Sequence, residues 1–341
     1  MSLHATAAAL VAPGKGILAA DESHPTMAKR LARIGVESSE RVRRDYRELL
    51  LATPRLSEHV SGVILFDETI RQTRSSGMPF AQGLLRAGII PGIKVDAGLA
   101  PLPRFPDESI TQGLDGLSDR LAEYAALGAR FAKWRAVIRI GAGRPSSTCI
   151  AANAHALARY AAAAQEQGLV PVVEPEVLMD GDHSLERCAL VTAAVLRAVY
   201  DQLARHRVDL GGTLLKPNMV LPGTDSGQVV GDDEVAAATL AVLRDTVPAS
   251  VPGLVFLSGG QSAEEATARL DALNRSGHQP WQLSFSFGRA LQAPVLDAWG
   301  GHHDHRDAAQ AALLHRARMN GLARRGRWSA ALEPSPPPLV A

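Results

Sequence analysis

The sequence predicts an α/β protein that forms a single closed (β/α)8 barrel. Eight short apolar segments alternate with longer, helix-like segments, and this alternation implies parallel strands because each parallel pair needs a long crossover connection. Charged residues also occur repeatedly at the ends of the apolar segments, where barrel enzymes carry their active sites. The candidate strands are 16–21, 62–66, 91–96, 131–138, 170–177, 212–219, 254–258 and 283–287.

The segments between these strands are rich in Ala, Leu, Arg and Glu, as helices are. An open doubly wound sheet is the second candidate fold, but no G-x-G-x-x-G sequence follows the first candidate strand. The spacer after that strand is long enough for more than one helix. The predicted helices are 39–51, 119–127, 147–167, 183–206, 233–245 and 262–274.

The end of the chain differs from the rest in composition. Residues 324–327 read Arg-Arg-Gly-Arg, and residues 334–338 read Pro-Ser-Pro-Pro-Pro. Such a segment is typical of an extended end without a core of its own. We therefore expect a barrel over residues 1–323 and a mobile, proline-rich tail over 324–341.

Charge and cysteine content narrow the class of protein. A formal net charge of +1 argues against a nucleic-acid partner, which normally requires a clustered basic surface. The two cysteines, Cys149 and Cys188, form no CxxC pair, are expected in the core, and are typical of a reducing cytoplasm. No stretch approaches the roughly 20 apolar residues of a membrane span, and the first residues lack a secretory pattern. We expect a cytoplasmic protein with no membrane partner.

Lys216 is the most informative residue. It lies in the segment GGTLLKPNM, residues 211–219, which otherwise reads as a buried strand. Lysine is seldom buried unless it is paired or functional, and buried lysines serve in Schiff-base chemistry. A neutral amine at this position could attack a ketone and form an iminium, which withdraws electrons from a neighbouring carbon–carbon bond.

Further charges occur at the other strand ends. Side chains two residues apart on a strand share a face, so each of three pairs points in one direction, whereas Trp134, between two of these residues, points outward. A single pair could be a structural ion pair, but burying the whole set would cost several kcal/mol per ion. Glu174 or Glu176 could move protons for the amine, and Asp21 could accept a hydroxyl proton. The three pairs are Lys94 with Asp96, Lys133 with Arg135, and Glu174 with Glu176.

Two loops have the character of phosphate sites. Ser258-Gly259-Gly260 follows the seventh candidate strand and Gly288-Arg289 follows the eighth, where barrels often bind phosphate. Glycines allow close approach of the main chain, and Arg289 can hold two phosphate oxygens. Gly259-Gly260 alone could also be a plain turn. A second anion site could form from Ser23, Thr26, Lys94 and Arg135.

One histidine-rich segment suggests a metal site. Residues 301–305 read Gly-His-His-Asp-His, but no ligand from another strand accompanies them at a suitable spacing. A solvated helix start is the better interpretation, and we expect neither a metal nor a cofactor.

Nine segments in order resemble the class I, Schiff-base fructose-1,6-bisphosphate aldolases, from residue 14 to about residue 327. They are GKGILAADES at 14–23, GVILFDET at 62–69, GIKVDAG at 92–98, TQGLDGLSDR at 111–120, FAKWR at 131–135, VEPEVLMDGDH at 173–183, GTLLKPNM at 212–219, FLSGGQS at 256–262 and GRALQ at 288–292.

The resemblance implies a role for each matching residue. Lys216 would be the Schiff-base nucleophile and Glu174 the main acid and base, assisted by Glu176 and Lys133, with Asp21 at the C4 hydroxyl. Lys94 and Arg135 would lie along the substrate and its far phosphate. It also implies a barrel, a homotetramer and a sugar bisphosphate substrate. The near phosphate would contact Ser258, Gly259, Gly288 and Arg289, and the other end would be lined by Ser23, Thr26, Lys29 and Arg30.

Three departures from the family pattern are visible. The family commonly has a small, flexible stretch after the residue matching Ser23, whereas this chain has His24-Pro25-Thr26. Lysine commonly follows the residue matching Asp96, and here it is Ala97. Many animal members end in tyrosine, and this chain ends in Ala341. We expect these differences to affect product release or substrate preference and to leave the chemistry intact.

Three functions follow from these observations. The leading one is retro-aldol cleavage of fructose 1,6-bisphosphate to glycerone phosphate and glyceraldehyde 3-phosphate. A Schiff-base aldolase for sedoheptulose 1,7-bisphosphate or a ketose monophosphate is the second. A non-catalytic, aldolase-like scaffold is the third, and it is disfavoured because every acid, base and nucleophile matches.

Overall fold

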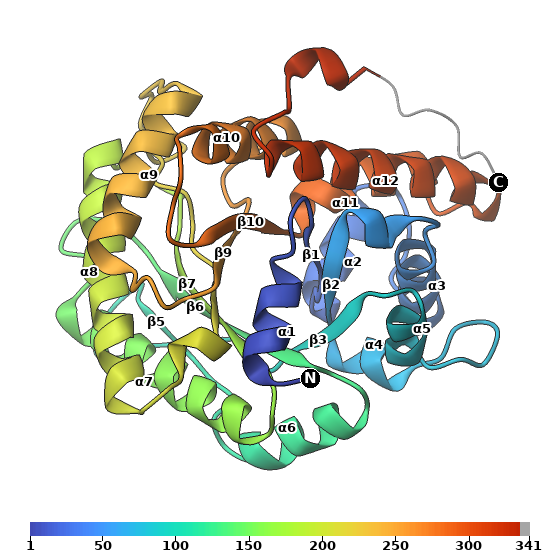
Figure 1. The fold of residues 1–341 in the computed structure, drawn as a ribbon, viewed down its shortest axis with the longest axis horizontal. Helices are drawn as coiled ribbons and strands as arrows, with labels where there is room; N and C mark the ends of the chain where they lie inside the picture. The colour runs from blue at the N-terminus through green and yellow to red at the C-terminus, as the bar shows by residue number, and fades with distance from the viewer. Residues whose placement is uncertain (335–341) are drawn as a thin grey trace.

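The computed structural model describes residues 1–334 and contains a closed barrel of eight parallel strands (Figure 1). The strand order is β1-β10-β9-β8-β7-β6-β3-β2, and β1 pairs with both β2 and β10. The predicted barrel is confirmed, and the alternative of an open sheet is wrong because no edge remains among these strands. Their bounds are β1 Gly16–Ala20, β2 Val60–Leu65, β3 Ile90–Lys94, β6 Phe131–Ile138, β7 Val170–Val177, β8 Leu214–Leu215, β9 Gly253–Phe256 and β10 Gln282–Phe287.

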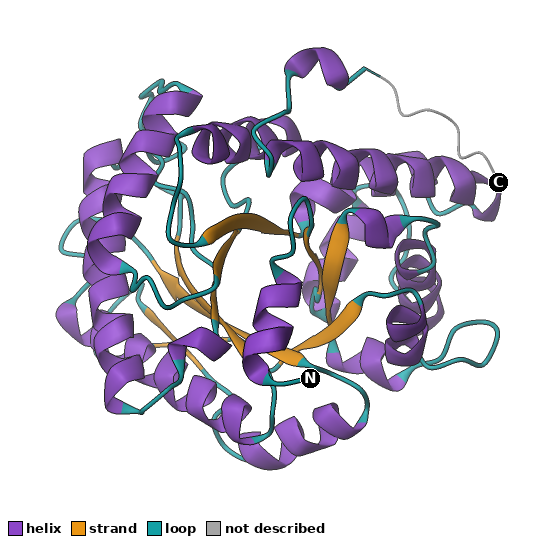
Figure 2. Cartoon of the chain, in the orientation of Figure 1, coloured by secondary structure: helices purple, strands orange, loops and turns teal. Residues whose placement is uncertain are grey.

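Helices surround the barrel, with the strands inside (Figure 2). Sequence analysis anticipated the helices α3, α6, α7, α8, α9 and α10 but not α1, α4, α5, α11 or the hairpin of β4 (Leu99–Pro101) and β5 (Ser109–Thr111), and it gave no bounds for α2 and α12. The helices are α1 Leu3–Leu10, α2 His24–Ala32, α3 Glu40–Leu51, α4 Asp67–Arg71, α5 Phe80–Arg86, α6 Leu117–Ala126, α7 Ser147–Glu166, α8 Leu185–Arg205, α9 Asp232–Thr246, α10 Ala263–Arg275, α11 Arg289–Trp299 and α12 Arg306–Ala323.

Five strands, β1, β2, β3, β8 and β9, end earlier than predicted at the end that carries the site. Strand β8 covers only Leu214–Leu215 instead of 212–219, because Pro217 has no N–H for the ladder and Gly212 belongs to a 3-10 turn. The Lys216 N–H still donates to the Val173 carbonyl of β7 at 2.8 Å. Asp21 follows β1 directly and Asp96 follows β3 after one residue, so these side chains lie on the rim of a rigid sheet.

Two cores hold the barrel together. One lies between strands and helices, and there Trp134 points outward as predicted and stacks on Tyr160 of α7 with ring centroids 5.6 Å apart. The other fills the barrel interior, where Leu10 and Val11, at the end of α1, pack against interior residues such as Val172. Helix α1 therefore closes the end of the barrel opposite the site (Figure 1).

The segment after α12 is packed as far as the structure describes it. Arg324 is buried and donates to the Val11 carbonyl, and the Trp328 indole N–H donates to Glu333 at 2.8 Å. Glu333 also pairs with Arg316 of α12 at 2.5 Å. The domain division at residue 324 stays a prediction, but residues 324–334 contact the barrel because they carry side chains that bond to it. Residues 335–341, which hold most of the proline-rich end, lie outside the described residues.

Other sequence-based expectations concern membranes and cysteines. Within residues 1–334, no helix combines the length and the apolar character that a membrane crossing requires. Cys149 of α7 and Cys188 of α8 are buried, as predicted.

Candidate active site

A cavity of about 990 Å³ opens at the C-terminal ends of the barrel strands. This size suits a small, extended ligand. Every residue that sequence analysis proposed for the site lines this cavity. These residues are Asp21, Ser23, Thr26, Lys29, Arg30, Lys94, Lys133, Arg135, Glu174, Glu176, Lys216, Ser258, Gly259, Gly288 and Arg289.

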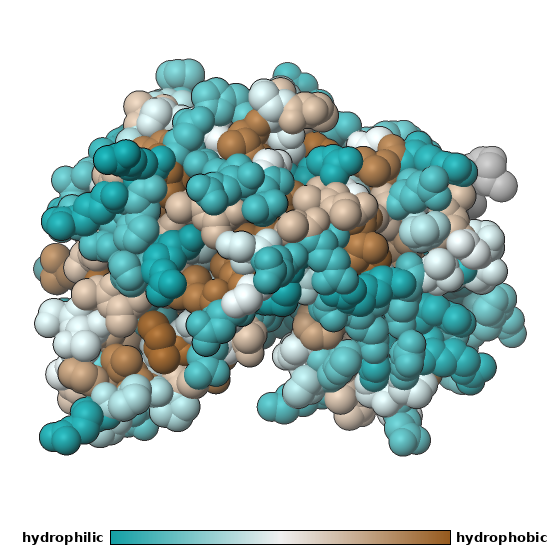
Figure 3. All heavy atoms as spheres, turned by 90° about the horizontal axis from the view of Figure 1, so that it is seen from below, coloured by the Kyte–Doolittle hydropathy of each residue, from teal (hydrophilic) through white to brown (hydrophobic). Residues whose placement is uncertain are grey.

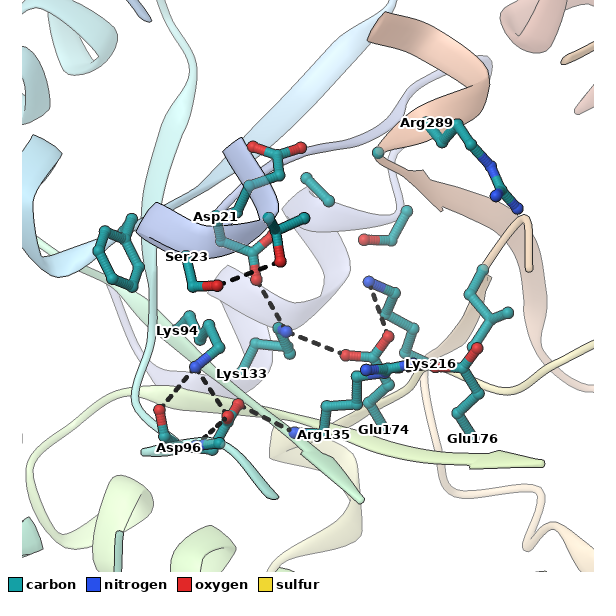
Figure 4. Close-up of a pocket in the computed structure, with 18 of the residues that line it drawn as sticks. Asp21, Ser23, Lys94, Asp96, Lys133, Arg135, Glu174, Glu176, Lys216 and Arg289 are labelled. Atoms are coloured by element: carbon teal, nitrogen blue, oxygen red, sulfur yellow. Dashed lines mark hydrogen bonds and ion pairs between the residues drawn. The ribbon is translucent and has the colours of Figure 1, made fainter. Parts of the chain in front are cut away.

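A chain of ion pairs occupies the centre of the cavity (Figure 4). Lys216 Nζ lies 3.0 Å from Glu174 Oε1, and Glu174 Oε2 lies 3.2 Å from Lys133 Nζ. Lys133 Nζ is in turn 2.7 Å from Asp21 Oδ2. Both lysines and Glu174 are at most 5% exposed, so two cations and two anions neutralise each other away from water.

The charged side chains in this chain of ion pairs shift one another's pKa values. Burial would raise the pKa of Asp21, but the ammonium groups of Lys133 and Lys216 outweigh burial and lower it from 3.8 to about 2. Burial would also raise the pKa of Glu174, and the same two lysines lower it. For Lys133, burial favours the neutral amine, whereas Asp21 and Glu174 raise its pKa above the usual value. Both carboxylates are therefore ionised at neutral pH, and Lys133 is charged.

A second group of charges continues along β3, β6 and β7. Arg135 Nε donates to Glu176, and the Arg135 main-chain N–H donates to Asp96 Oδ2 at 3.3 Å. Lys94 Nζ lies 2.7 Å from Asp96 Oδ1 and donates to the Asp96 carbonyl at 2.7 Å. Burial opposes the charge of Arg135, but Glu176 and Glu174 raise its pKa. Asp96 thus holds both Lys94 and the strand that carries Arg135.

The loops after β9 and β10 form one side of the cavity. A Cβ atom at position 259 would lie 2.9 Å from Glu176 Oε1, so a side chain there would collide with a site residue. Gly260 has φ +74°, a conformation that favours glycine. Gly288 precedes α11 and offers no side-chain cap, so the first N–H groups of that helix are available to an anion. Arg289, the first residue of α11, lines the cavity beside them.

The start of α2 forms another part of the rim. Ser23 Oγ and Thr26 Oγ1 lie 3.1 Å apart, and both residues line the cavity with Lys29 and Arg30. Arg30 Nη1 pairs with Glu22 Oε1 at 2.5 Å. Within residues 1–334, no carboxylate forms an ion pair with Lys29 or Arg289, so these two cations are available to an anionic ligand.

Glu22 is a site residue that sequence analysis missed. Its carboxylate contacts Arg30, Arg47 of α3 at 2.7 Å and Gln292 of α11 at 2.7 Å. Gln292 Nε2 also donates to the Ala19 carbonyl at 2.7 Å. Glu22 therefore joins the end of β1 to α2, α3 and α11. Its position between Asp21 and Ser23 indicates that Glu22 belongs to the site. Its contact with Gln292, 270 residues away, follows from no local pattern in the sequence.

Several other residues complete the lining without having been predicted. Arg33 and Arg120 add positive charge, and Phe66 and Tyr124 add apolar surface. Among residues 1–334, no three His, Cys, Asp or Glu side chains lie in a position to hold a metal ion. His303 and Asp304 are fully exposed in a 3-10 turn before α12, which agrees with a solvated helix start.

Comparison with known proteins identifies the family. Residues 2–335 match the model of the family described as "Fructose-bisphosphate aldolase class-I". A Xanthomonas campestris protein named "Probable fructose-bisphosphate aldolase class 1" is 56% identical over 95% of this chain and 97% of its own. "Fructose-bisphosphate aldolase 4, cytosolic" of Arabidopsis thaliana is 54% identical over 96% of this chain and 83% of its own.

A solved structure shows the same fold. The fructose-bisphosphate aldolase of Plasmodium falciparum, solved in complex with TRAP and a small-molecule inhibitor, superposes with a TM-score of 0.95. It is 48% identical, and the match covers 96% of this chain and 95% of that chain. The chain belongs to the class-I fructose-bisphosphate aldolase family and is a lyase of that class.

Proposed function

We propose that Lys216 forms the Schiff base through which this chain cleaves fructose 1,6-bisphosphate. The observation that carries the proposal is the contact of 3.0 Å between Lys216 Nζ and Glu174 Oε1 in a buried setting. A carboxylate at that distance can exchange protons with the amine. Glu174 accepts a proton from the Lys216 ammonium, and the neutral amine attacks the C2 ketone. A proton then moves from the attacking nitrogen to the C2 oxygen, Glu174 returns its proton so that water departs, and an iminium remains.

Asp21 is the proposed base for bond cleavage. It removes the C4 hydroxyl proton, the C3–C4 bond breaks, and its electron pair moves into the iminium to give an enamine. Glyceraldehyde 3-phosphate leaves as the aldehyde. Protonation of the enamine at C3 and hydrolysis of the resulting iminium release glycerone phosphate and restore the amine. The low pKa of Asp21 keeps it ionised, and Lys133, 2.7 Å away, orients it and offsets the charge of both carboxylates.

The rim residues are proposed to hold the two phosphates. Ser258, Gly259, Gly288 and Arg289 supply N–H groups and a guanidinium for the near phosphate. Lys94 and Arg135, from β3 and β6, lie across the ion-pair chain from Arg289 (Figure 4). Ser23, Thr26, Lys29 and Arg30 line the end for the far phosphate. Cations at both ends favour a bisphosphate over a monophosphate.

Borohydride trapping tests the chemistry. Purified protein is reduced in the presence of fructose 1,6-bisphosphate, with and without EDTA, and its peptides are mapped by mass spectrometry. We expect an adduct on Lys216 that survives EDTA and is absent from Lys216→Met. No adduct, with activity lost to EDTA, would overturn the proposal in favour of a metal-dependent enzyme.

The choice of substrate needs a separate measurement. Sedoheptulose 1,7-bisphosphate also carries two phosphates, and fructose 1-phosphate carries one. Comparison of kcat/KM among the three sugars reports the transition-state stabilisation that each phosphate supplies. We expect fructose 1,6-bisphosphate to have the highest value. Absence of turnover with every sugar by folded protein would instead favour the non-catalytic scaffold.

A cytoplasmic homotetramer is proposed for the assembly. The family resemblance implies a tetramer, and the Arabidopsis relative is named cytosolic. Leu190 of α8 and Val229 are exposed apolar side chains that an interface would cover. On the face shown in Figure 3, hydrophobic residues lie in small groups among hydrophilic ones. Sedimentation velocity measures the assembly, and a monomer at micromolar concentration would contradict the tetramer.

A further inference from the structure

His24 lies at the start of α2 but turns away from the cavity. Its neighbours Ser23, Pro25 and Thr26 line the cavity, and His24 does not. Its Nε2 lies 3.1 Å from Glu68 Oε2 of α4, and its ring packs edge-on against Phe66 with centroids 5.2 Å apart. A neutral ring with hydrogen on Nε2 and a protonated ring can both donate to this carboxylate.

Glu68 is a fixed acceptor. Arg43 of α3 donates to it twice, from Nε at 2.8 Å and from Nη2 at 2.5 Å. Both side chains are largely buried, at 15% and 16% exposure. Burial would raise the pKa of Glu68, but the hydrogen bonds and charge of Arg43 lower it, so the group is ionised at neutral pH. His24 thus connects the start of α2 to a carboxylate that α3 and α4 hold in place.

The first turn of α2 has few other bonds that fix it. Ser23 is the N-cap residue but makes no capping bond, and its hydroxyl contacts Thr26 Oγ1 instead. Pro25, in the first turn, fixes its own φ and has no N–H to donate. Ser23 and Thr26 both line the cavity, and neither hydroxyl is used to cap the helix.

We propose that His24 is a positioning residue that, by bonding Glu68, holds Ser23 and Thr26 ready for the far phosphate of a sugar bisphosphate. This inference rests on the proposed function. A loop that is already ordered loses less conformational entropy when the ligand binds, so affinity increases without a new contact to the ligand. The effect is confined to substrates with the far phosphate, and fructose 1-phosphate lacks it.

Steady-state kinetics of His24→Ala with both sugars test the inference. A partly exposed contact of this kind contributes modestly, so we expect KM for fructose 1,6-bisphosphate to rise by about threefold, with kcat unchanged. Kinetics with fructose 1-phosphate should not change. His24→Gln should recover part of the loss, because its amide N–H can still donate to Glu68. Glu58→Gln breaks an exposed pair with Arg55 of 2.8 Å, outside the cavity lining, and serves as the matched control.

The other outcomes have separate meanings. An unchanged KM for the bisphosphate, or an equal rise for both sugars, would overturn the inference. Thermal melting of each variant checks that it is folded. If His24→Ala does not fold, the kinetics of His24→Gln are compared with those of the wild type instead. A wild-type protein that cleaves neither sugar and traps no adduct would contradict the proposed function itself, and that result is distinct from a KM that does not respond to His24.

Discussion

The centre of the cavity and its rim at α2 hold their charges in different ways. At the centre, Lys216, Glu174 and Lys133 project from adjacent strands, are nearly inaccessible to water, and neutralise one another. At the rim, Lys29 and Thr26 are exposed and lie on α2, a helix of nine residues without a side-chain cap at its start. Strands hold the reacting groups in a closely defined geometry, whereas helix ends fray. We infer that the centre determines the chemistry and the rim the choice of substrate.

The largest effect expected from the centre is that of Lys216→Met. Methionine keeps much of the volume but removes the amine, so no Schiff base forms. We expect kcat to fall by about 10⁵-fold or more, as for removal of a covalent nucleophile. Stopped assays with fructose 1,6-bisphosphate and borohydride trapping measure the loss. A variant that keeps more than about 1% of the activity would contradict the role of Lys216.

Glu174→Gln should have the next largest effect. The amide keeps the shape and can still contact Lys216 and Lys133, but it cannot accept and return a proton. We expect kcat to fall by about 10³-fold, within the range for a general acid or base. Rapid mixing should show slower formation of the trapped adduct. A loss of activity that came only from unfolding would appear as a lower melting temperature, and it would weaken the assignment.

How much of this structure the sequence predicts depends on how far apart in the sequence the contacting residues lie. The period of the strands places Lys133 with Arg135 on one face of their strand, and Glu174 with Glu176 on one face of theirs, because alternation is a local property of the chain. Pro217 shortens β8, and that effect also has a local cause. In contrast, the plug formed by α1 and the contact of Arg324 with Val11 depend on residues that meet only in the closed barrel. Local patterns carry no information about such pairs.

The rim shows the same limit within the site. Sequence analysis proposed Ser23 and Thr26 first for a second anion site and then, through the resemblance, for the far end of the substrate, and it identified His24-Pro25 as a departure. It could not find Glu68 as the partner of His24, because the two lie on different helices. The departure therefore had no physical explanation until the fold placed α4 beside α2.

A smaller effect is expected on the free energy of unfolding at acid pH, and it is specific to Asp21 at the centre of the cavity. The pKa of Asp21 is about 2 in the folded chain and 3.8 ordinarily, so its stabilising contribution is present above about pH 4 and is lost as the pH falls towards 2. We expect the difference in free energy of unfolding between wild type and Asp21→Asn to shrink by about 1 kcal/mol from pH 6 to pH 3. Urea denaturation at fixed protein concentration measures it. A constant difference would show that the pairing with Lys133 does not lower the pKa of Asp21.

A smaller effect than those of Lys216 and Glu174 is expected at Glu22, which links the two regions. Its carboxylate touches Arg30 at the rim and Gln292 on the helix that carries Arg289. Glu22→Gln keeps the volume, removes the charge, and leaves Arg30 and Arg47 without their anion. Glu22 contacts residues at both phosphate ends, so we expect kcat/KM to fall for fructose 1,6-bisphosphate and for fructose 1-phosphate alike. The expected fall is about tenfold, which corresponds to about the energy of one hydrogen bond to a charged group.

The effects of Glu22→Gln and His24→Ala on the two sugars can therefore be compared directly. Substitution of His24 should affect only the sugar with two phosphates, whereas substitution of Glu22 should affect both sugars. Glu333→Gln is a suitable control, because Glu333 also pairs with an arginine, Arg316, but lies outside the cavity lining. If Glu22→Gln lowered kcat/KM only for fructose 1,6-bisphosphate, Glu22 would act at the rim alone. Gln292 and the barrel would then hold the near-phosphate end without the help of Glu22.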